Sequence, residues 1–157
     1  MENPVRISAE IGINHNGDLD TAAVAAFVGA GSGYIATWYD QSGEGNHAVQ
    51  TTAAAQPLYV ASGQSGRPVA RFDGTDDGLL CVMSTLAQPN TILCVGKANN
   101  KARAYKFIGN RTASTENVLT QVAPSGVLRM YAGASLDGAE DRSGQWFVAV
   151  ALFNTAN

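Results

Sequence analysis

The chain has 157 residues, of which 45% are hydrophobic and 15% are charged, and its net charge is -3. The charged fraction lies below the ~25% usual in soluble domains, which excludes a coiled coil or a disordered acidic tail. Because its ten Lys and Arg residues are scattered singly, we do not expect nucleic acid as a partner. No apolar run is long enough to predict a membrane span, and the opening residues MENPVRIS do not resemble a signal peptide.

Short apolar runs separated by Gly, Asn, Asp and Ser dominate the chain, a pattern typical of an all-β sandwich or barrel. We predict a single domain over residues 1–157. The predicted strands cover residues 5–8, 34–39, 48–50, 68–72, 78–82, 91–96, 104–108, 117–122, 127–131 and 146–153. The runs SGEGN, DGTDD and PSG between them are rich in residues that favour turns.

One helix is predicted near the N-terminus, over residues 19–28. Asp18 or Asp20 can cap its first turn, and Gly29 stands where a left-handed residue commonly ends a helix. Three apolar residues share one face of it at a spacing of four: Leu19, Ala23 and Phe27.

The most apolar run, residues 146–153 with the sequence WFVAVALF, predicts a central strand buried on both faces. Such a strand needs hydrogen-bonded neighbours on both sides, and only four residues follow it. We therefore expect that earlier strands flank it, that the chain is a piece of a larger polypeptide, or that another subunit completes the sheet.

Cys81 and Cys94 both fall in apolar runs, GLLCVM and TILCVG. We expect reduced cysteines that act as small hydrophobic residues. The alternative is a disulfide, which requires the two runs to lie side by side.

Several segments occur in the order seen in one group of proteins. They are residues 5–8, 11–12, 17–20, 27–29, 37–50 (TWYDQSGEGNHAVQ), 56–57 and 66–77 (GRPVARFDGTDD). Together they resemble the concanavalin A-like (laminin G-like) sandwich domains of bacteriophage and environmental bacterial proteins, and the front half of the catalytic domain of α-L-arabinofuranosidase B. The resemblance covers about residues 5–80 and implies an antiparallel β-sandwich, a concanavalin A-like jelly roll, with one short N-terminal helix.

The chain departs from this group at two places. Residues 7–10 read Ile-Ser-Ala-Glu where members usually carry Ser-Ser-Asp, and members usually continue through a further hairpin after the position of Phe153. The catalytic carboxylates of the arabinofuranosidase group lie in its later half, outside the matched segment. We therefore predict no catalytic residue in this chain.

Acidic residues in two predicted turns are candidates for binding or for turn formation. Asp40 can be a sugar or calcium ligand, or its carboxylate can accept the backbone N–H groups of Ser42 and Gly43; we favour the second reading. The second group can contribute oxygens to a Ca²⁺ site or form a hairpin turn, and we favour the turn because the EF-hand spacing is absent. This group consists of Asp73, Asp76 and Asp77. We expect no cofactor unless this group binds Ca²⁺.

Flat aromatic side chains beside amide and carboxylate groups are suited to contact sugars. The candidate carbohydrate-binding residues are Trp38, Tyr39, Asp40, Gln41, Tyr105 and Tyr131. Strand alternation puts Trp38 and Tyr39 on opposite faces, so we expect one in the core and the other outward. His15 and His47 are expected to be surface turn residues, since each stands beside an asparagine.

These observations predict a non-catalytic structural or adhesive module of a virion (tail or capsid decoration) or of a surface protein. Its expected partners are other subunits of an assembly, including copies of itself, and glycans. The expected location is the virion or the extracellular surface. A glycoside hydrolase related to α-L-arabinofuranosidases is the alternative, and it would require two carboxyl groups that face one glycosidic bond.

Overall fold

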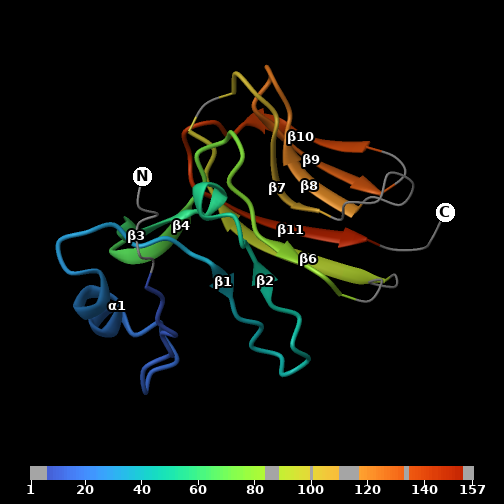
Figure 1. Ribbon diagram of the computed structural model, residues 1–157. Coiled ribbons are helices and arrows are strands. Elements are labelled where there is room, and N and C mark those ends of the chain that lie inside the picture. The colour runs from blue at the N-terminus through green and yellow to red at the C-terminus, as the bar shows by residue number, and fades with distance from the viewer. Residues whose placement is uncertain (1–6, 84–88, 100, 110–116, 133–134, 154–157) are drawn as a thin grey trace. The chain divides into compact units, whose positions relative to one another are not determined.

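A computed structural model describes residues 7–83, 89–99, 101–109, 117–132 and 135–153 (Figure 1). The protein is mostly β, with several antiparallel sheets and one α-helix, as the sequence predicts. The chain divides into two compact units, Met1–Met83 and Ser84–Asn157, and each is described by itself. The single domain and the sandwich stay predictions.

The first unit contains the helix, a 3-10 turn and five strands. These elements are α1 (Thr21–Val28), β1 (Thr37–Trp38), β2 (Ala48–Val49), η1 (Ala53–Ala55), β3 (Leu58–Gln64), β4 (Arg67–Arg71) and β5 (Leu80–Cys81). Strands β1, β2 and β5 form a three-stranded antiparallel sheet, and β3 pairs with β4.

Helix α1 is confirmed, and Asp20 caps it by accepting a hydrogen bond from the Ala23 N–H at 3.0 Å. The helix ends at Gly29, whose φ of 56° suits glycine. The predicted buried face of Leu19, Ala23 and Phe27 is wrong. Val24 is the buried residue of the helix, whereas Phe27 is 39% exposed.

Strand β3 was not predicted, because its second half reads ASGQ and resembles a loop. The structure folds this run back onto β4 through Ser65 and Gly66, both of which have positive φ. Two consecutive positive φ values match the right-handed twist of a tight hairpin. Residues 7–8 form no strand, against the prediction for 5–8, and residues 5–6 lie outside the described ranges.

The second unit consists of β6 (Asn90–Gly96), β7 (Tyr105–Gly109), β8 (Asn117–Gln121), β9 (Val127–Ala132), β10 (Ser135–Asp141) and β11 (Phe147–Phe153). Strands β7 to β10 form a four-stranded antiparallel meander, and β11 pairs with β6. The rings of Phe107 and Phe147 meet edge to face with centroids 4.9 Å apart, which joins the two sheets of this unit.

Strand β10 was also missed, because SLDGAED is polar and reads as a turn. All of its residues are exposed, so no hydrophobic alternation marks it. It pairs with β9, and the Arg129 guanidinium donates two hydrogen bonds to the Asp137 carboxylate at 2.5 and 2.7 Å. A cross-strand ion pair therefore accompanies the pairing of this edge strand.

The predicted strand over residues 146–153 is present as β11, but it is buried on one face and not on both. Its residues alternate: Phe147, Ala151 and Phe153 are buried, whereas Val148 and Val150 are exposed. The physical reason is that β11 pairs only with β6 among the described strands, and the four-stranded sheet covers one face of this pair. An apolar run can therefore be half exposed.

Candidate functional site

The loop after β1 is organised by Asp40. Its carboxylate accepts hydrogen bonds from the Ser42 N–H at 2.9 Å, the Ser42 hydroxyl at 2.7 Å and the Asn46 N–H at 3.0 Å. These bonds, the Ser42 hydroxyl foremost, hold the pKa of Asp40 below its usual value. The favoured turn-forming role is confirmed, with one correction: Asn46 is the second backbone donor, in place of Gly43.

The neighbours of Asp40 also make hydrogen bonds, within the loop and to the N-terminal segment. The Tyr39 hydroxyl donates to Glu10 at 2.7 Å, and this hydrogen bond raises the pKa of Tyr39. Gln41 donates its amide to the Tyr39 carbonyl at 3.1 Å. His47 is half-buried, packs edge-on against the Tyr39 ring and accepts the Asp40 N–H on Nδ1 at 3.1 Å, so it is more than a surface turn residue.

Trp38 and Tyr39 are both exposed, at 55% and 38%, so the expectation that one of them is a core residue is wrong. The reason is that β1 is only two residues long, so strand alternation does not extend to Tyr39. Trp38 therefore offers an accessible aromatic surface in this loop region.

Replacing Asp40 with alanine is expected to lower the melting temperature, because three hydrogen-bond donors lose their acceptor. We do not expect the variant to lose ligand binding while its stability stays unchanged. Asp76→Ala is the charge-matched control, since no hydrogen bond to the Asp76 carboxylate occurs in the described residues. Thermal melting of both variants checks the prediction. Unchanged melting of Asp40→Ala together with lost binding would assign Asp40 to a ligand site.

The same variant has an expected pH dependence. The folded-state pKa of Asp40 is lowered, so its contribution is present above the unfolded value of about 3.9 and is lost as the pH falls through the folded value. The melting difference between wild type and Asp40→Ala should therefore shrink in strong acid.

Tyr105 and Tyr131 lie in the second unit, on β7 and β9. In the antiparallel register Tyr105 lies opposite residue 121, which lies opposite Leu128, so Tyr105 and Leu128 share one face of the sheet. Tyr131 is three residues beyond Leu128 and faces the opposite side. The six predicted sugar-contacting residues are therefore divided between two units, and the two tyrosines do not form one platform.

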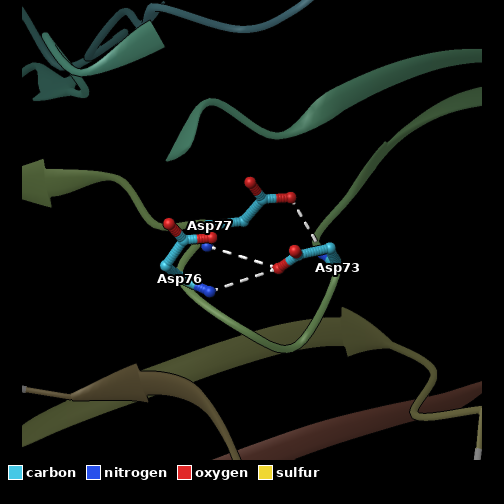
Figure 2. A group of neighbouring side chains, drawn as sticks. All are labelled: Asp73, Asp76 and Asp77. Carbon is cyan, nitrogen blue, oxygen red and sulfur yellow. Dashed lines mark hydrogen bonds between the residues drawn. The ribbon is translucent and has the colours of Figure 1, made fainter. Parts of the chain in front are cut away.

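The three aspartates of the loop after β4 surround one turn (Figure 2). The Asp73 carboxylate accepts the N–H groups of Thr75 at 2.7 Å, Asp76 at 3.3 Å and Asp77 at 3.4 Å. Asp77 in turn accepts the Asp73 N–H at 2.8 Å. These bonds, that from Thr75 foremost, lower the pKa of Asp73 and show that the group forms a turn.

One carboxylate oxygen of each aspartate lies within 4.8 Å of the others. Ca²⁺ requires six to eight oxygens, and two of the six available here already accept backbone N–H groups. The aspartates could supply part of such a shell. Calcium binding stays a prediction.

A hollow of about 250 Å³ lies beside this turn within the first unit. It is lined by Tyr34, Ala54, Gln56, Leu58, Arg71, Asp73 and Asp77. Only its two aspartates were predicted as site residues. The others were missed because the pairing of residue 34 with residue 58, and of 58 with 71, is a long-range feature that spacing in the sequence does not reveal.

Cys81 and Cys94 are free cysteines in the structure, and both are half-buried. Their reduced state stays a prediction. Cys81 donates from Sγ to the Asn46 carbonyl at 3.1 Å, and burial raises the pKa of the Cys94 thiol. Within the described residues, no helix is long and apolar enough to cross a membrane.

Comparison of the chain with models of protein families, with curated proteins and with solved structures finds no match.

Proposed function

We propose that this chain is a non-catalytic structural module of a virion or surface assembly, built on a concanavalin A-like sandwich, whose β6–β11 sheet binds a second copy of the chain. The resemblance of residues 37–50 and 66–77 to phage and environmental bacterial domains supports the setting. The single observation that carries the assembly role is the outward face of β6 and β11.

This face is apolar and regular. In the antiparallel register Val148 lies opposite Val95, and Val150 lies opposite Leu93. These four side chains and Leu152 are between 57% and 67% exposed. Within the described strands β6 and β11 this face carries no charged residue, and opposed aliphatic side chains pack well on such a surface.

Energetics favour covering this face. Burying an exposed Val or Leu contributes about 1.5–3 kcal/mol. At exposures of 57–67%, five such side chains contribute roughly 5–9 kcal/mol, and the same face of the second copy contributes as much again. Together they can offset an association cost of roughly 4–15 kcal/mol. Contiguous exposed apolar surface of this kind usually marks a site of protein association, because isolated folded domains rarely leave it in water.

The mass of the purified chain in light scattering tests the proposal. We expect a defined oligomer for the wild type and the mass of one chain for Val150→Lys, with an unchanged circular dichroism spectrum, because a buried unpaired ammonium opposes association. Leu136→Lys is the matched control. Leu136 is 65% exposed, against 64% for Val150, and lies on β10 of the other sheet of the same unit.

Two results would contradict the proposal. One is a wild-type chain that is a monodisperse monomer. The other is an oligomer that Val150→Lys and Leu136→Lys disrupt equally, which would place the interface away from the β6–β11 face.

Glycan binding is a second candidate function, favoured by the exposed indole of Trp38. It would make the module adhesive as well as structural, and a glycan array probed with the purified chain tests it. Glycoside hydrolysis has less support. A hydrolase needs two carboxyl groups that face one glycosidic bond, and the Asp73 and Asp77 carboxylates instead accept backbone N–H groups within one turn.

A further inference from the structure

The hollow in the first unit is built from neighbouring backbone segments. Tyr34 bridges to Leu58 in antiparallel register, and Leu58 pairs with Arg71 across β3 and β4. Residues directly opposite one another in a ladder share a face, so Tyr34, Leu58 and Arg71 form one row. Two backbone hydrogen bonds fix the row beside β3, from the Ile35 N–H to the Pro57 carbonyl at 2.8 Å and from the Tyr59 N–H to the Gly33 carbonyl at 2.9 Å.

Polar groups lie beside this row, along the chain from Leu58 and from Arg71. Gln56 precedes Leu58 by two residues in extended backbone, with φ of -83° and ψ of 128°, while the intervening Pro57 is fully buried. The alternation of an extended chain therefore turns Gln56 toward the side of Leu58. Asp73 and Asp77 line the hollow beyond Arg71.

The hydrogen-bonding capacity of these groups is only partly used. The Arg71 guanidinium makes no ion pair or hydrogen bond within the part of the chain that the structure describes. Gln56 donates its amide N–H to the Gln50 carbonyl at 2.9 Å, and its Oε1 has no donor among the described residues. In the turn, Asp73 accepts with Oδ1 and Asp77 accepts with Oδ2, and among the described residues no hydrogen bond to the other carboxylate oxygen of Asp77 occurs.

We propose that this hollow binds one neutral sugar ring. The exposed Tyr34 ring, which is 59% accessible, supplies an apolar surface for the C–H groups of the sugar. Arg71 donates to hydroxyl oxygens, while Asp73, Asp77 and the Gln56 carbonyl accept hydroxyl protons. Each hydroxyl of a sugar can both donate and accept a hydrogen bond. A sugar therefore matches a lining that contains both donors and acceptors.

Size and charge narrow the class of ligand. The volume of about 250 Å³ is below the range of about 300–1,000 Å³ typical of drug-sized ligands, which suits one ring of an oligosaccharide. The lining contains two carboxylates, Asp73 and Asp77, and one guanidinium, Arg71, so its net charge is negative and repels the carboxylate of a sugar acid. The hollow therefore favours neutral hexoses or pentoses. This inference rests on the glycan-binding candidate above and is independent of the assembly role.

The test is titration of the ¹⁵N-labelled full chain with D-glucose, D-galactose and L-arabinose, followed by NMR. At least one neutral sugar is expected to shift amide signals of residues 54–58 and 71–77. Tyr34→Ala and Arg71→Met are each expected to weaken binding roughly tenfold or more. Phe27→Ala is the matched control, because Phe27 is an exposed aromatic residue of the same unit outside the hollow, and should bind as the wild type does.

Other outcomes would overturn the proposal and separate it from glycan binding in general. Loss of sugar binding in Trp38→Ala with retention in Tyr34→Ala would keep a glycan-binding chain but move the site. Tighter binding of D-glucuronate than of D-glucose would refute the neutral class. Binding that disappears with EDTA would replace direct contact by a calcium bridge. No binding of any of the sugars would refute the site.

Circular dichroism of both hollow variants excludes unfolding as the cause, and Tyr34→Phe, which keeps the aromatic ring, should retain binding.

Discussion

Phe153→Ala is expected to destabilise the chain by about 3–5 kcal/mol, the range found for truncating buried aromatic residues. Phe153 is 2% exposed at the end of β11 and is among the largest fully buried side chains of the described residues. Its removal deletes apolar contacts and leaves a cavity that the paired strands β6 and β11 cannot close without losing their register.

Urea denaturation of Phe153→Ala measures this loss. Leu136→Ala is the control, since Leu136 is 65% exposed and a surface truncation usually changes stability by no more than about 0.5 kcal/mol. Similar unfolding midpoints for the two variants would show that the inner face of β11 is not part of a packed core.

Gly63→Ala is the second substitution with a large expected effect, a destabilisation of about 1–3 kcal/mol from overpacking. A Cβ at Gly63 would overlap the Val69 methyl groups and lie 3.1 Å from the Val69 Cβ. Because a Cβ moves only with the backbone, the β3–β4 hairpin would have to shift. At a position with free space around the Cβ, a Gly→Ala change stabilises a protein by about 0.4–1 kcal/mol. The overlap with Val69 is therefore the reason that we expect a loss of stability at Gly63.

Two further variants make this prediction specific. Gly78→Ala meets no atom within 4 Å and should be neutral or slightly stabilising. Val69→Ala introduced together with Gly63→Ala should recover part of the loss, because it removes the overlapping methyl groups. Equal melting temperatures for Gly63→Ala and Gly78→Ala would contradict the close packing of Gly63 on Val69.

The strands that the sequence predicted well are those with dense apolar or β-branched residues. The run TILCVG and the run FVAVALF fall in β6 and β11 with boundaries within one residue. The strands that were missed, β3 and β10, contain ASGQ and DGAED, whose residues favour turns. They form because a neighbouring strand offers hydrogen bonds, and this partner is not encoded in the local run.

The candidate site divides in the same way. The role of Asp40 was predictable, because an aspartate followed by Ser and Gly has its hydrogen-bond partners within a few residues. The hollow was not predictable, because Tyr34, Leu58 and Arg71 meet only after two long-range pairings. His47 was underestimated for the same reason, since its contacts with Tyr39 and Asp40 depend on the closure of the loop.

By itself the sequence determined the β-rich class, the helix with its Asp20 cap, and the turns organised by Asp40 and Asp73, since each depends on residues close together in the chain. Only the tertiary structure decided which face of β11 is buried, which strands pair, and which side chains line the hollow. The reason is that alternation marks two faces of a strand without saying what covers either of them. Burial and convergence depend on the segments that pack against that strand.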